Sequence, residues 1–147
     1  MKIKYIFPVS LFVLSFFVFV GCSGGKSDEV KITESGLIEK VSKSSGLTRS
    51  QTQIGLSALM MLSEEILLPD EFTKLTKDLP GGDNLFEFAS DLGFTPGAIN
   101  TTADIVQILI DLGANPVDAG KFLTSVLSVT KSIEGGSFSL LSKVFEK

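Results

Sequence analysis

The chain has 147 residues, of which 13 are basic and 17 acidic, for a formal net charge of −4. It contains no histidine and a single cysteine, which excludes Ser-His-Asp and Cys-His catalytic groups, histidine metal sites and an internal disulfide. The acidic balance, without a basic patch that carries interleaved aromatic residues, argues against nucleic-acid binding. We therefore expect a protein that is not an enzyme and holds no cofactor.

Residues 1–21 have the three parts of a secretory signal peptide. Lys2 and Lys4 form a basic start, an almost wholly apolar run follows, and the segment ends in a small residue. The apolar run from 5 to 21 contains Pro8 and is shorter than the stretch of about 20 apolar residues that a transmembrane helix needs. A cleaved leader is therefore predicted.

The leader ends in Phe19-Val20-Gly21-Cys22, which resembles the lipobox of bacterial lipoproteins, where a small residue precedes the modified cysteine. The resemblance implies cleavage before Cys22 and attachment of several acyl chains at its sulfur, which gives durable membrane anchoring. By the same resemblance, Ser23 implies the outer membrane, with the protein facing the periplasm. Two alternatives are an ordinary apolar role for Cys22 and an intermolecular disulfide.

After the leader we expect a flexible tether over 22–33 and one domain over 34–147. Removing 21 residues from 147 leaves 126, enough for a single domain with a real core. Both leader charges are basic, so this mature chain carries 11 basic and 17 acidic residues, a net charge of −6. Its stability must come from packing alone, because no disulfide can form within it.

The domain has helical spacing of apolar residues and weak strand signals. This predicts an all-α fold, a compact bundle of six or seven short helices. Glycine corners at 45–48, 93–96 and 113–116 separate the segments. Helices are expected at about 35–44, 48–67, 70–77, 84–92, 119–133 and 138–145. A further helix includes residues 105–110 and ends at about 112. Residues 105–110 are apolar nearly all round, so their helix is expected to be the central, most buried element.

The domain also contains a possible internal duplication, with copies at about 36–78 and 103–144 and a bridge over 80–102. A shift of 67 residues superposes Ile38, Val41, Gly46 and Thr48 on Ile105, Ile108, Gly113 and Asn115. Chance similarity between amphipathic helices is the alternative. A shared corner favours duplication, because helical periodicity alone does not place a glycine and a cap together.

Several of these corners carry a family resemblance. The run from Leu37 through Phe86 is similar to the VcgC/VcgE-type family of small uncharacterised bacterial exported proteins, and a later corner also fits. The similarity is carried by Ser45-Gly46-Leu47-Thr48, Phe72-x-x-Leu75, Leu79-Pro80-Gly81 and Leu92-Gly93-Phe94-Thr95-Pro96. It implies an exported domain of unknown function and no established activity.

Few residues are candidates for chemistry. Ser128 and Lys131 match the Ser-x-x-Lys of penicillin-binding proteins, but no Ser-Asp-Asn or Lys-Thr-Gly accompanies them. We expect both on the solvent side of a helix, and we predict no catalytic residue and no metal ligand. The phenylalanines of the domain are expected mostly in the core. Phe86 and Phe94 lie off the main apolar stripes and are candidates for an exposed partner patch, with burial in the core as the alternative.

The leading functional hypothesis is a lipid-anchored helical module of the cell envelope that has a structural role or binds another protein or envelope component. The alternative is a carrier that holds a lipid or other apolar small molecule inside the bundle. The apolar run at 105–110 suggests this alternative.

Overall fold

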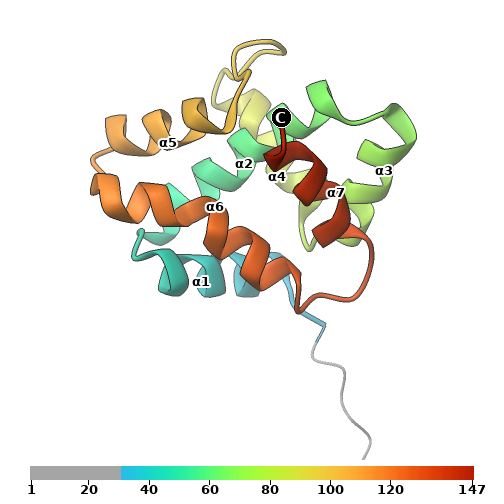
Figure 1. The fold of residues 1–147 in the computed structure, drawn as a ribbon, viewed down its shortest axis with the longest axis horizontal. Helices are drawn as coiled ribbons and strands as arrows, with labels where there is room; N and C mark the ends of the chain where they lie inside the picture. The colour runs from blue at the N-terminus through green and yellow to red at the C-terminus, as the bar shows by residue number, and fades with distance from the viewer. Residues whose placement is uncertain (1–30) are drawn as a thin grey trace, which may run out of the picture. The chain divides into compact units, whose positions relative to one another are not determined.

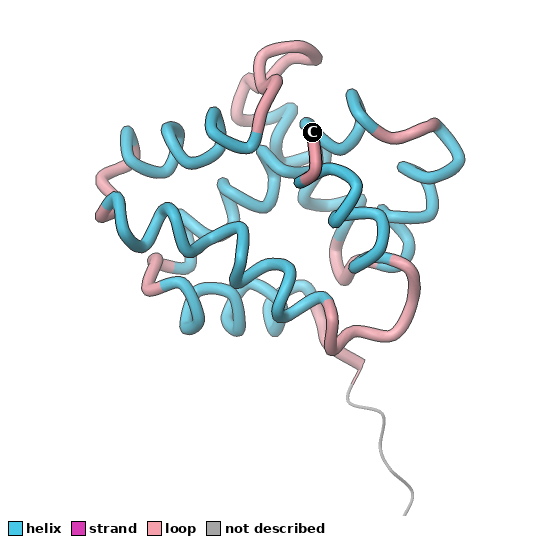
Figure 2. The backbone as a smooth tube through the Cα atoms, viewed as in Figure 1, coloured by secondary structure: helices cyan, strands magenta, loops and turns pink. Residues whose placement is uncertain are grey.

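The computed structural model describes residues 31–147. Cys22, the predicted leader and most of the predicted tether lie outside this range. The described part of the chain contains seven helices and no strand, so the predicted all-α bundle is confirmed (Figures 1 and 2). The helices are α1 (Glu34–Ser45), α2 (Arg49–Ile66), α3 (Pro69–Asp78), α4 (Gly82–Asp91), α5 (Thr102–Asp111), α6 (Pro116–Thr130) and α7 (Ser137–Phe145).

Side-chain caps begin four of the helices. Thr33 accepts from the backbone N–H of Gly36 at 3.2 Å. Thr48 and Thr101 take part in reciprocal capping boxes at the starts of α2 and α5. Asn115 accepts from the N–H of Val117 at 2.8 Å and begins α6. Each cap pairs a backbone donor that the first helical turn leaves free, which fixes where the helix starts.

The central helix is α2, and the expectation that residues 105–110 would be the most buried element is wrong. Ten of the 18 residues of α2 are buried, whereas only Ile105 and Leu109 of α5 are. Small residues allow this burial, because neighbouring helices can approach them closely. Two buried serines, Ser57 and Ser63, donate to carbonyls of their own helix at 2.9 and 2.7 Å, so their hydroxyls need no water.

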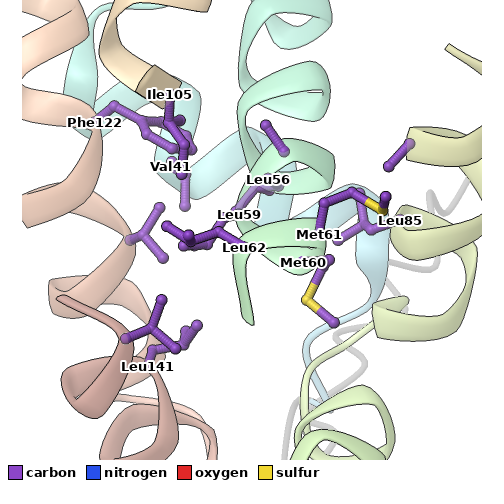
Figure 3. Packing of buried hydrophobic residues seen from close by; sticks show 14 of the residues in the cluster. Val41, Leu56, Leu59, Met60, Met61, Leu62, Leu85, Ile105, Phe122 and Leu141 are labelled. Carbon is purple, nitrogen blue, oxygen red and sulfur yellow. The ribbon is translucent and has the colours of Figure 1, made fainter. Parts of the chain in front are cut away.

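The core surrounds α2 on several sides (Figure 3). Phe122, Val41 and Ile105 meet on one side of α2, while Met61 points toward Leu85 on the other. These side chains come from α6, α1, α5, α2 and α4, so a single core joins helices from both halves of the sequence.

The order of elements repeats as the duplication predicts. The helices α1–α2–α3 and α5–α6–α7 form the two copies, and α4 lies in the bridge. Gly46 and Gly113 end the first helix of each copy with φ of 89° and 84°. Helix α1 packs on α6, and α5 packs on α2, so the first helix of each copy lies against the long helix of the other. Figure 1 shows α6 between α5 and α1.

The copies also make matching contacts at their corners. Gln51 is the third residue of α2, and its Nε2 donates to the carbonyl of Leu112 at 3.2 Å. Residue 118 is residue 51 plus 67, and Asp118 lies against Gly46, where an added Cβ would be 3.0 Å from its Oδ1. Each long helix thus presents its third residue to the corner of the other copy. A common origin of the copies stays a prediction.

Candidate functional site

An open apolar groove lies where α2, the end of α4 and α5 meet. Its volume is about 290 Å³, and it is lined by Ile54, Leu92, Phe94, Ile108, Asp111 and Leu112. Five of these six residues are apolar. Leu92 and Leu112 are 42 % and 44 % exposed, and both line this one hollow.

Two similar helix ends build this groove. At the end of α4, the N–H of Phe94 donates to the carbonyl of Ala89 at 3.1 Å. At the end of α5, the N–H of Ala114 donates to the carbonyl of Leu109 at 3.0 Å. Both are Schellman motifs, which fold the chain back after a left-handed glycine. The motif turns Phe94 back toward its own helix and into the groove.

The start of α5 is held by Asp104, which positions the helix that forms one wall. The backbone N–H groups of Asn100 and Thr101 each donate to Asp104 Oδ2 at 2.9 Å. These two hydrogen bonds hold the pKa of the Asp104 carboxyl below its usual value. The connection from α4 to α5 is thereby tied to the first turn of α5.

The structure does not bring Phe86 and Phe94 to one place in this groove. Phe94 lines it, whereas Phe86 packs edge-to-face against Phe72, with ring centroids 5.2 Å apart and an interplanar angle of 68°. Phe86 therefore joins α4 to α3. A partner role for either phenylalanine stays a prediction.

Sequence reasoning missed the other apolar residues of the groove. Leu92 and Leu112 each directly precede a glycine corner, at the same place in an Asp-Leu-Gly triplet. The repeated triplet is the signal that could have found them, because it places both leucines at the same position of the same kind of helix end.

The chemical candidates lie away from the groove. Ser128 and Lys131 are exposed at the end of α6, and the structure shows no hydrogen bond between them. Among residues 31–147 no three acidic side chains gather closely enough to hold a metal ion. Nor does any helix within this range have the length and apolarity needed to cross a membrane.

A second hollow, at the start of α1, differs in character. It has a volume of about 570 Å³ and is lined in part by Lys31, Glu34, Lys77 and Asp83. Asn84 Nδ2 donates to Glu34 Oε2 at 2.9 Å across it. Its charges are mixed, so it lacks the apolar lining that distinguishes the groove beside Phe94.

The fold and the groove define an all-helical bundle with an apolar surface hollow. The family described as "Protein of unknown function VcgC/VcgE (DUF2780)" matches residues 24–143, and the chain belongs to this family. The family resemblance predicted from the corners is thus confirmed. No curated protein and no solved structure matches the chain. Since the family description carries no activity, function has to be argued from the site.

Proposed function

We propose that the chain is a lipid-anchored helical module of the bacterial cell envelope that binds another protein through the groove beside Phe94. The observation that carries this proposal is the exposure of Leu92 and Leu112 in one hollow that three further apolar side chains also line. Apolar side chains that are exposed together in one place often mark an interaction site.

The groove suits a helical or extended segment with apolar anchors. In helix-in-groove recognition, side chains from one face of an amphipathic segment enter a hydrophobic groove. The lining comes from helices α2 and α5 and from a hydrogen-bonded helix end, so the receiving surface is already formed. A preformed surface binds more tightly because little conformational entropy is lost on binding.

The anchor of this proposal is Cys22, which lies outside the described residues. The lipobox supports it, and Ser23 supports the outer membrane with the domain in the periplasm. The chain between Cys22 and Lys31 can span about 30 Å when fully extended, which keeps the domain near the bilayer.

A carrier role has less support. The helix that suggested it buries Ile105 and Leu109 completely, and an added Cβ at Gly55 would meet both Leu109 and Phe122 within 3.2 Å. That interior is filled with side chains. A binding role in place of a catalytic one is supported by the lack of histidine in the sequence and by the exposed positions of Ser128 and Lys131.

The test is site-specific photo-crosslinking in intact cells, with a benzoylphenylalanine placed at residue 112 or at residue 68. Leu68 is 68 % exposed at the start of α3 and does not line the groove, so it is a matched control. We expect a discrete protein adduct from position 112 that is absent from position 68. Identical patterns at the two positions, or no adduct at either, would contradict the proposal.

A further inference from the structure

Charge is distributed unevenly along the folded domain. Residues 78–120 contain seven acidic side chains and not one lysine or arginine. The acidic residues are Asp78, Asp83, Glu87, Asp91, Asp104, Asp111 and Asp118. This segment includes α4, α5 and the connection between them, and it therefore supplies five of the six residues that line the groove.

The rest of the chain is close to neutral. Residues 22–147 carry 11 basic and 17 acidic side chains, so subtracting the seven leaves 11 basic and 10 acidic residues outside 78–120. The net negative charge of the mature chain thus belongs to this segment, but not all of it lies at the groove. Asp78 and Asp118 pair with Lys74 and Lys121, and Asp83 lines the hollow at the start of α1. An electrostatic field of one sign beside an apolar hollow selects partners of the opposite sign.

One aspartate lines the groove, and a second is next to a lining residue in the sequence. Asp111 lines it, and Asp91 directly precedes Leu92; both aspartates are exposed. The four ion pairs found among the described residues involve neither of them. Asp111 accepts one hydrogen bond, from Gln107 Nε2 at 2.8 Å, which leaves acceptor capacity free. At both helix ends, an exposed aspartate therefore directly precedes an exposed leucine of the groove.

From this juxtaposition we infer that the occupant of the groove is a cationic amphipathic segment of another envelope protein. Its apolar side chains lie against Leu92, Phe94 and Leu112, and its lysine or arginine side chains meet Asp91 and Asp111. This inference rests on the proposed function and adds the chemical class of the partner.

The same charges disfavour two other occupants. A second copy that used the same face would place the aspartates of both copies close together, and like charges across an interface are costly. An anionic lipid surface would be repelled in the same way. A neutral apolar segment would gain nothing from Asp91 and Asp111, whereas a cationic one gains attraction and a faster association rate.

The test uses the membrane-extracted full protein, reconstituted in phosphatidylcholine nanodiscs, and two fluorescein-labelled helical peptides with the same leucine face. One peptide has lysines on its polar face and the other has glutamates. Fluorescence anisotropy measures binding, and empty nanodiscs give the background. We expect the lysine peptide to bind at least about tenfold more tightly than the glutamate peptide, because two sites change from attraction to repulsion. The difference should shrink at high salt.

Two variants, each with a matched control, locate the effect. Asp91→Asn with Asp111→Asn should weaken the lysine peptide severalfold, whereas Glu64→Gln with Glu65→Gln removes the same charge from the exposed end of α2 and should not. Leu112→Ser should weaken both peptides, and Leu68→Ser neither. Circular dichroism confirms that each variant is folded.

The outcomes separate this inference from the proposed function. If the two peptides bind equally well, and Leu112→Ser but not Leu68→Ser weakens them, the inference of a cationic partner is overturned. The groove would then still be a binding site. Equal effects of Leu112→Ser and Leu68→Ser overturn both. Self-association of the protein that Leu112→Ser abolishes would identify a second copy as the occupant and also overturn the inference.

Discussion

The ring of Phe122 occupies the space that a side chain at Gly55 would need. A Cβ added at residue 55 would lie 2.8 Å from Phe122 Cζ, and Phe122 is fully buried. Residue 122 is residue 55 plus 67, so the two are equivalent positions of the two copies. Two large side chains at these positions would collide, because the Phe122 ring already lies against residue 55. One glycine and one phenylalanine fill this place without a collision or a void.

We predict that Gly55→Ala destabilises the protein by about 1 kcal/mol or more. Alanine gains about 0.5–1 kcal/mol in helix propensity over glycine. Overpacking against a buried ring costs about 1–3 kcal/mol, so the collision outweighs the gain. Urea unfolding followed by circular dichroism measures this, since the sequence has no tryptophan. Phe122→Leu in the same chain should recover part of the loss, which a double-mutant cycle detects as coupling.

Gly120→Ala is the control for this prediction. Gly120 lies in α6, is exposed, and would have no atom within 4 Å of an added Cβ. The same substitution there should stabilise the protein by about 0.5–1 kcal/mol. If alanine had the same effect on stability at 55 and at 120, the close contact between Gly55 and Phe122 would not be the cause of the loss.

The two glycine corners should respond differently to alanine. Gly46 and Gly113 both have positive φ, so alanine is strained at each by about 1–2 kcal/mol. At Gly46 the new Cβ would also meet Asp118 at 3.0 Å, whereas at Gly113 it would meet nothing within 4 Å. Gly46→Ala should therefore cost more stability than Gly113→Ala. Adding Asp118→Ala to each variant should remove the difference; a difference that persisted would contradict this explanation.

Asp78 should make stability depend on pH in acid. Lys74 forms an ion pair with its carboxylate, and the N–H of Gly136 donates to Oδ2 at 2.9 Å. Both hydrogen bonds hold the pKa of Asp78 below its ordinary value of 3.8. Because the folded pKa is lowered, the stabilisation is present above about pH 4 and is lost as pH falls through the folded pKa.

Asp78→Ala tests this by urea unfolding at about pH 7 and about pH 3. The variant should lose about 1–2 kcal/mol at neutral pH and should depend less on pH in acid than the parent. Glu64→Gln, on an exposed turn of α2, should leave the acid dependence in place. A variant with the parent's acid dependence would show that Asp78 does not join α3 to α7.

Helix ends were predictable from the sequence because they depend on local chemistry. A glycine that adopts positive φ and a threonine or asparagine that caps the next helix lie within three residues of each other. Gly46 with Thr48, and Gly113 with Asn115, therefore gave the corners and the repeated order of helices. Family membership followed from the same corners.

Burial and the groove were not predictable in this way. In sequence, 105–110 is more apolar than α2, but α2 contains Gly55, Ser57 and Ser63, whose small size lets other helices close around it. Leu92 and Leu112 are 20 positions apart, and only the packing of α4 and α5 on α2 brings them to one hollow. Phe86 and Phe94 look alike in the pattern, and their different surroundings arise from tertiary contacts alone.

The central claim, a lipid-anchored envelope module, is tested most directly by the mass of the protein extracted from cell membranes. Intact mass spectrometry, with fragmentation of the N-terminal peptide, identifies the first residue and any group on its sulfur. We predict a chain that begins at Cys22 and carries acyl chains there. A chain that begins at Met1, or a Cys22 thiol that reacts freely with iodoacetamide, would contradict the account.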